Sequence, residues 1–227
     1  MLPVTKPYKG AFEVHGNTAM FARPDSDADA ASYPAPTYSA VKGMIEHICG
    51  HSAGARIVPT KVHICRPVRY DRFTYNGRFA AQRKGTLIKE GNAVQRRETI
   101  LTDVAYQIFF EIVYIGDQYL RGAALRHAGT NHAHYLLEMF KRRIARGQPL
   151  RPVALGRSEH VPTYLGELLP ETSPDPAVNI EIGRMMRHPF SQDDNYDGKS
   201  RYAPRFDDNV RVVNGVLSFE AEEAICA

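Results

Sequence analysis

The stretch DVAYQIFFEIVYI, residues 103 to 115, has the strongest strand pattern in the chain. Apolar or aromatic residues occupy every second position from Tyr106 to Tyr114, so one side of an extended backbone is continuously hydrophobic. This alternation predicts a β-strand with one face on the core.

Two amphipathic helices are predicted, one before and one after this strand. Residues 37 to 50, TYSAVKGMIEHICG, have helical apolar spacing, with Thr37 as N-cap and Gly50 as the stop. Residues 130 to 148, TNHAHYLLEMFKRRIARGQ, form a basic helix ending at Gly147. The inward residues of this second helix are predicted to be Leu136, Leu137, Phe140 and Ile144.

The remaining strands are predicted from shorter patterns. Residues 10 to 24 alternate and then reach Gly16, which predicts a first strand ending in a turn there. Residues 61 to 73 are strand-like up to Pro67. The pairs Asn76-Gly77 and Asn214-Gly215 each predict a two-residue hairpin. Residues 82 to 97 are basic and predicted to be mobile.

The order of these elements predicts an α+β fold. Strand, helix, strand pair, strand, helix and strand match a ferredoxin-like (RRM-like) β-α-β-β-α-β core, with both helices on one face of the sheet. The composition changes after residue 157, because residues 158 to 227 hold thirteen acids and six bases. We therefore expect an RNA-binding core in residues 1–157 and a C-terminal β-containing extension in residues 158–227.

Basic residues are concentrated in two windows. Residues 56 to 97 hold eleven Lys or Arg and two acids, and residues 141 to 157 hold six and none, whereas the rest of the chain has 12 bases and 23 acids. If the two windows meet in space, they form one strongly positive face suited to a polyanion. Aromatic residues in or beside the windows suit the face to nucleic-acid bases as well as phosphates: Tyr70, Phe73, Tyr75, Phe79, Tyr135 and Phe140. The alternative is a basic surface without function.

Several classes of protein are disfavoured. No apolar run approaches the roughly 18 residues of a membrane span, and the N-terminus lacks a signal-peptide core, so a cytoplasmic protein is expected. Cys49, Cys65 and Cys226 show no CxxC spacing, which indicates neither a disulfide framework nor a zinc knuckle. Glycine-rich phosphate loops and serine-hydrolase elbows are absent.

A metal site at His132 and His134 is also disfavoured. Side chains two residues apart on a helix point about 200° apart and cannot hold one ion, although they could do so in an extended segment. No third ligand lies at a recognised spacing. We expect no metal and no other cofactor.

RNA cleavage needs only side chains, because RNA supplies its own nucleophile in the 2′-OH. One group must help to deprotonate that hydroxyl, another must protonate the leaving 5′-oxygen, and cations must stabilise the phosphorane. Residues 132 to 146 contain histidine, tyrosine, lysine and arginine together, which permits this chemistry without being diagnostic of it.

Six stretches resemble the CRISPR-associated Cas-five proteins of subtype I-C. They cover most of the chain in the order of the family: FEVHGNTAMFARP (12–24), YPAPTYSAVKGMIEHI (33–48), RPVRYD (66–71), QRRETILTDVAYQIFFEI (95–112), MFKRRIARGQPLRPVALGRSEH (139–160) and, more weakly, IEIGRMMRHPF (180–190). The resemblance implies an RRM-like ferredoxin core with a C-terminal β-domain. It also implies binding of the CRISPR repeat hairpin and its 3′ flank, metal-independent cutting of the precursor RNA, retention on the 5′ handle and assembly with other type I-C Cascade subunits.

The reactive residues of the family do not carry over directly. Where the family has a tyrosine at the end of the first helix, this chain has Cys49 between His47 and His51. Where the family has a Lys-His pair at the start of the second helix, this chain has His134-Tyr135 or, shifted by one, Tyr135-Leu136. The candidate catalytic residues are therefore His134, Tyr135 and His51. The candidate RNA-binding residues are Tyr38, Lys42, Arg69, Arg96, Arg97, Lys141, Arg142, Arg146 and Arg157.

Two functions stay open at this point. One is an endoribonuclease specific for a repeat hairpin, in which the three candidates have taken over the acid, base and orienting roles. The other is a non-catalytic subunit that binds the 5′ handle within the interference complex. A general RNA-binding protein outside CRISPR systems is a more remote third option.

Overall fold

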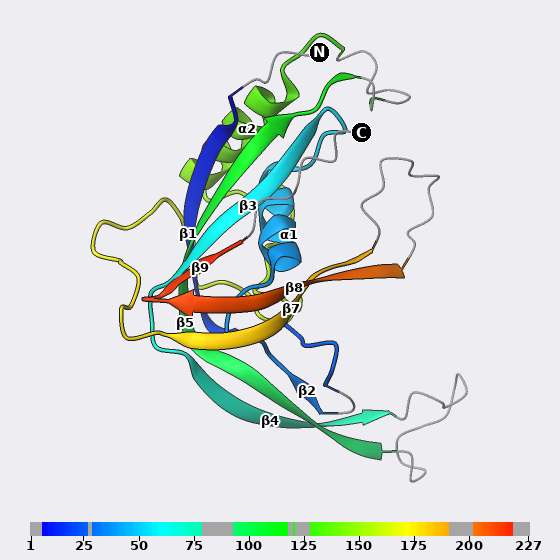
Figure 1. Ribbon diagram of the computed structural model, residues 1–227, viewed down its shortest axis with the longest axis vertical. Helices are drawn as coiled ribbons and strands as arrows, with labels where there is room; N and C mark the ends of the chain where they lie inside the picture. The colour runs from blue at the N-terminus through cyan, green and yellow to red at the C-terminus, as the bar shows by residue number, and fades with distance from the viewer. Residues whose placement is uncertain are drawn as a thin grey trace.

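The computed structural model describes residues 6–26, 29–78, 93–117, 120, 128–190 and 202–219. These residues form two helices and nine strands that belong to one sheet (Figure 1). The strands are β1 (Tyr8–Ala19), β2 (Ala30–Ala31), β3 (Ala55–Ile64), β4 (Arg69–Arg78), β5 (Ala93–Tyr114), β6 (Tyr164–Gly166), β7 (Ile180–Phe190), β8 (Tyr202–Val213) and β9 (Val216–Ser218). The helices are α1 (Tyr38–Cys49) and α2 (His132–Arg146).

The long strand β5 organises the sheet. Along its second half β5 pairs with β1 on one side and β3 on the other, and along its first half it pairs with β4. The main path runs β6-β1-β5-β3-β9-β8-β7, and all pairs are antiparallel except the short pair of β2 with β5. The predicted strand at residues 103 to 115 is confirmed, because Tyr106, Ile108, Phe110 and Ile112 are buried on one face of β5.

Both predicted helices are confirmed with their ends. The Thr37 side chain accepts a hydrogen bond from the Ala40 N–H, and Gly50 follows the last turn of α1. Helix α2 ends at Gly147, which has left-handed backbone angles that favour glycine. The predicted inward residues of α2 are all buried, and Phe140 packs edge-on against Phe110 of β5. The two helices contact each other and share one hydrophobic core with the sheet.

Three predictions about the strands are wrong. Strand β1 continues past Gly16 to Ala19, and the Gly16 backbone instead makes a close approach to Leu155. Asn76 and Gly77 lie inside β4, paired with Gln95 and Val94, so they form no hairpin turn. Residues 93–97, predicted to be mobile, belong to β5 and pair with β4. Residues 82–92, Phe79 and Cys226 lie outside the described residues.

The second Asn-Gly prediction is confirmed. Asn214 and Gly215 connect β8 to β9, and both have positive φ, at 49° and 75°. These angles suit a type I′ hairpin turn.

Residues on both sides of position 157 contribute to the same sheet. Beyond it, β6 pairs with β1, and β9 pairs with β3. Val178, Met185, Val212 and Leu217 join the same hydrophobic core. The predicted mixed α+β class is thus confirmed as a large antiparallel sheet with two helices, while the division at residue 157 stays a prediction.

A buried carboxylate fastens the segment after β6 to the sheet. Glu13 is fully buried in β1, where Oε2 accepts hydrogen bonds from Leu169 N–H and Gln107 Nε2, and His15 lies 2.6 Å from Oε1. Gln107 also donates to the Thr172 carbonyl. Burial alone raises the pKa of Glu13, but the hydrogen bonds from Leu169, His15 and Gln107 outweigh it and hold this pKa below its ordinary value.

Candidate functional site

The start of α2 presents a histidine and a tyrosine to solvent. Asn131 caps the helix by accepting the His134 N–H at 3.1 Å, and its amide donates to the Tyr8 hydroxyl at 3.0 Å. The rings of Tyr8 and His134 lie 5.6 Å apart. Tyr135 is half exposed. Tyr8 was not predicted from the sequence, because this side chain comes from β1, more than a hundred residues away from α2 in the chain.

Basic side chains continue along the exposed surface of α2. Lys141, Arg142 and Arg146 are all exposed. Lys141 is paired with Glu138 at 3.0 Å, and Arg142 Nη2 lies 2.9 Å from the sulfur of Met139. Both contacts lie at the surface, so Lys141 and Arg142 remain available to phosphates.

The loop after α1 reaches the start of α2. His51 is exposed, and the next residue, Ser52, places its hydroxyl 2.9 Å from His132 Nδ1. The structure therefore brings the segment with His51 close to the segment with His134 and Tyr135. Among the described residues, these three candidates make no hydrogen bond with one another.

Cys49, which stands where the family has a tyrosine, is unsuited to acid or base chemistry. The side chain is buried, and the thiol faces the Ile45 carbonyl. Burial raises the pKa of Cys49 to about 12, so the thiolate is scarce at neutral pH.

A second basic surface lies on β4 and the first half of β5. Residues 69–74 of β4 are exposed on both faces, so Arg69 and the aromatic rings of Tyr70 and Phe73 are open to solvent on this strand. Arg69 is 4.0 Å from Asp103. Arg96 and Arg97 lie opposite Tyr75 and Thr74 in the pairing of β5 with β4, where Arg97 is exposed and Arg96 half-buried.

The basic residues on α2 and those on β4 with the first half of β5 do not meet in one compact face. Helix α2 and strand β4 lie toward opposite ends of the long axis of the molecule (Figure 1). A polyanion that contacts both must extend along the protein.

Three other candidate RNA-binding residues lie in different settings. Lys42 is half-buried on α1. Arg157 is paired with the buried carboxylate of Glu98. Tyr38 is only 1% exposed, and its ring lies under the guanidinium of Arg187 at 4.2 Å. This burial removes Tyr38 from the candidate RNA contacts.

Within the described parts of the chain, no group of three or more His, Cys, Asp or Glu is placed to hold a metal ion. His132 is buried, whereas His134 is exposed on the other side of the helix. The same residues contain no helix long and apolar enough to cross a bilayer.

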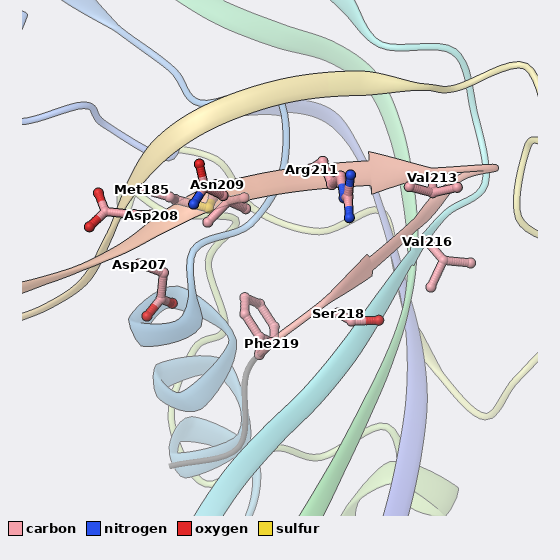
Figure 2. A pocket seen from close by; sticks show the side chains of 10 residues that line it. Met185, Asp207, Asp208, Asn209, Arg211, Val213, Val216, Ser218 and Phe219 are labelled. Atoms are coloured by element: carbon pink, nitrogen blue, oxygen red, sulfur yellow. The ribbon is translucent and has the colours of Figure 1, made fainter. Parts of the chain in front are cut away.

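A pocket of about 410 Å³ lies along β8 and β9, and the ring of Phe219 in its lining packs edge-on against Tyr38. Figure 2 shows the carboxylates of Asp207 and Asp208 on its β8 side and the ring of Phe219 just beyond β9. Asp207 already receives two hydrogen bonds from Arg187. Such an acidic lining disfavours phosphate binding there.

The protein thus has an α+β fold and two exposed basic surfaces, one of which also carries exposed aromatic rings. The family model Cas_Cas5d, described as CRISPR-associated protein (Cas_Cas5), matches residues 11–219. The chain belongs to this Cas5 family, as the resemblance in its sequence indicated.

Two relatives carry the name CRISPR pre-crRNA endoribonuclease Cas5d. The protein from Thermus thermophilus is 29% identical over 177 residues, which cover 77% of this chain and 70% of the relative. The protein from Mannheimia succiniciproducens is 26% identical over 227 residues, covering 92% of this chain and 95% of the relative.

Solved structures share the fold. The crystal structure of a CRISPR-associated protein matches with a TM-score of 0.64 and 21% identity, over 98% of both chains. A functionally uncharacterized protein from Streptococcus mutans, SMU1763c, matches with a TM-score of 0.63 and 19% identity, over 94% of this chain and 93% of that one.

Proposed function

We propose that this protein is an endoribonuclease that recognises the repeat hairpin of precursor CRISPR RNA, cuts it without a metal ion and stays on the 5′ handle in the type I-C interference complex. The observation that carries the proposal is the start of α2. There, exposed His134 and Tyr135 lead into a helix surface lined by cations, in a chain whose relatives are named pre-crRNA endoribonucleases.

The proposed chemistry uses the RNA 2′-OH as nucleophile. The 2′-oxygen attacks the adjacent phosphorus, and the bond to the 5′-oxygen breaks. His134 and Tyr135 are the proposed acid and base, with His51 as an orienting group, and Arg142 and Arg146 stabilise the negative charge. Histidine suits such a role because its ordinary pKa lies near neutrality.

We infer that β6-β1-β5-β3 with α1 and α2 form a ferredoxin-like core. Its support is the strand order, the antiparallel pairing of each neighbouring pair, and the position of one helix between β1 and β3 and the other between β5 and β6. Strand β6 falls at residues 164–166, so a core defined in this way extends beyond residue 157. The later residues that form β7 to β9 are then the extension.

The RNA is proposed to run between the two basic surfaces. Phosphates contact the candidate RNA-binding residues on α2 and on the arm that β4 forms with the first half of β5. Bases stack on exposed rings such as Tyr70 and Phe73. The candidate contacts that remain are Lys42, Arg69, Arg96, Arg97, Lys141, Arg142, Arg146 and Arg157. Other subunits of the interference complex are the proposed protein partners.

A second candidate function is a subunit that binds the 5′ handle without cutting. The buried Cys49 favours it, because no tyrosine hydroxyl is present where the family has one. In this case another nuclease matures the RNA.

Incubating the purified protein with labelled repeat RNA in EDTA tests the proposal. We expect one specific cut in the repeat. Binding without a cut at any pH would replace the enzyme by the handle-binding subunit, and a cut that requires added divalent metal would overturn the metal-independent mechanism.

A further inference from the structure

His132, the first residue of α2, is buried between side chains from two other segments. Its Nδ1 lies 2.9 Å from the hydroxyl of Ser52, in the loop between α1 and β3. Its Nε2 lies 3.7 Å from a carboxylate oxygen of Asp117, just after β5. The imidazole ring is also parallel to the ring of Tyr114 and packs against Gly54. The chain thus places a carboxylate, an imidazole and a hydroxyl in a row.

The side chains around His132 favour one of its two ring nitrogens as the position of the proton. Asp117 accepts hydrogen bonds from the Gly129 N–H at 2.6 Å and from the Tyr114 hydroxyl at 3.0 Å. The Gly129 N–H in particular holds the pKa of Asp117 below its ordinary value, so this group is a carboxylate at neutral pH. An anion facing Nε2 favours a proton on that nitrogen, which leaves Nδ1 of neutral His132 as an acceptor.

With the proton on Nε2, the Ser52 hydroxyl donates its hydrogen bond to His132 Nδ1. The Ser52 oxygen also accepts the Gly54 N–H at 3.4 Å, which fits the same orientation. His132 itself is only 6% exposed and cannot reach a polymer, whereas Ser52 is half-buried and follows the exposed His51. Ser52 is the end of the row that an RNA can touch.

We propose that Ser52, His132 and Asp117 form a proton relay for RNA cleavage, with Ser52 as the catalytic residue and the other two as positioning residues. This inference rests on the proposed function, and it gives Ser52 the role of base that was shared above between His134 and Tyr135, which keep the role of acid. The RNA 2′-OH gives its proton to the Ser52 oxygen while Ser52 gives its own to His132 Nδ1, and the imidazolium is stabilised by Asp117.

The step balances within the RNA and the protein. The 2′-oxygen bonds to phosphorus, the bond from phosphorus to the 5′-oxygen breaks, and a 2′,3′-cyclic phosphate forms. The leaving 5′-oxygen takes a proton from the exposed acid at the start of α2. Afterwards His132 releases its proton to water and the acid regains a proton from water, so both groups return to their starting states.

The test is single-turnover cleavage of a labelled RNA that contains one CRISPR repeat from the source genome, measured between pH 5 and 9. Ser52→Ala is expected to slow cleavage about 10²-fold with RNA affinity unchanged, and Ser52→Thr, which keeps a hydroxyl, to restore most of the rate. Asp117→Asn is expected to move the midpoint of the acid limb to lower pH, because the imidazolium loses its neighbouring anion.

Thr18→Ala is the matched control. It removes a hydroxyl that lies 2.8 Å from Nδ1 of another buried histidine, His160, and so measures the structural cost of losing such a contact. Its cleavage rate and pH profile should match those of the unmodified protein. Normal cleavage by Ser52→Ala with an unshifted profile for Asp117→Asn would overturn the relay and leave the proposed function standing. If the unmodified protein cuts no repeat RNA, both the relay and the proposed endoribonuclease function are wrong.

Discussion

His134 and Tyr135 are exposed side by side at the first turn of α2, while the basic residues lie further along the helix. We predict that His134→Ala and Tyr135→Phe each slow cleavage by about 10² or more and change RNA affinity only slightly. The rate should also bend between about pH 6 and 8 if a histidine carries the proton. Single-turnover rates and binding titrations on the same RNA separate the two effects.

Tyr164→Phe is a suitable control for Tyr135→Phe. It removes one tyrosine hydroxyl that bonds the Glu167 carbonyl in the segment after β6. Cleavage should be unaffected. If His134→Ala and Tyr135→Phe also cut normally, the reactive groups lie elsewhere, and His47 and His51 are the next histidines to test.

Glu13 gives a prediction about stability and pH. Since the pKa of Glu13 is lowered in the folded protein, its stabilising effect is full above the ordinary carboxyl pKa and is lost as the pH falls through the folded value. Glu13→Ala should lower the free energy of unfolding by about 2 kcal/mol at pH 7, since buried donors lose a charged acceptor. Urea denaturation should show a smaller difference below about pH 4. An equal difference at both pH values would contradict this assignment.

Residue types could be predicted from the sequence, but their contacts could not. The histidines and tyrosine near the start of α2 were found because capping and periodicity place that start within a residue or two. Tyr8 and Ser52 were missed, since each meets α2 only through pairing of distant strands. Tyr38 was misjudged because its cover, Arg187, comes from β7.

At the scale of elements, α2 and the arm of β4 and β5 are expected to bind phosphates. We predict that replacing both Arg142 and Arg146 by alanine, or both Arg96 and Arg97, weakens RNA binding by roughly 1 kcal/mol or more per pair. Affinity should fall steeply with salt, and each double variant should show a shallower salt dependence. Fluorescence titrations at several salt concentrations measure both quantities.

Arg184 and Arg205 supply the matched control for these charge changes. Both are exposed on β7 and β8, outside the two basic windows. Replacing both by alanine should leave binding within about twofold, because these charges lie outside the proposed RNA path. Binding that does not depend on salt would contradict the phosphate contacts.

The two Asn-Gly pairs show what local sequence can and cannot predict. Asn214-Gly215 forms a turn because its flanking strands β8 and β9 pair with each other. Asn76-Gly77 has the same local preference, yet β4 continues through it because β5 offers a partner along the whole length of β4. Helix ends were predicted more reliably, since a cap acts within one turn.

At the scale of the whole molecule, a single sheet joins segments that differ in charge. The C-terminal strands β7 to β9 extend the sheet from β3, a connection that composition does not predict. The basic residues of α2 and those of β4 with the first half of β5 lie apart in space, because β5 is long enough to carry its first half away from the helices (Figure 1). Charge segregation along the chain could be read from the sequence, but its arrangement in space depends on strand pairing.

The most direct test of metal-independent cleavage is a pair of labelled repeat RNAs incubated with the protein in EDTA, one fully ribose and the other with a single 2′-deoxy nucleotide just upstream of the cut. We predict that both RNAs bind equally well, that the first is cut, and that the second is not cut, since its nucleophile is missing. Cutting of the deoxy RNA at the same place would contradict the account.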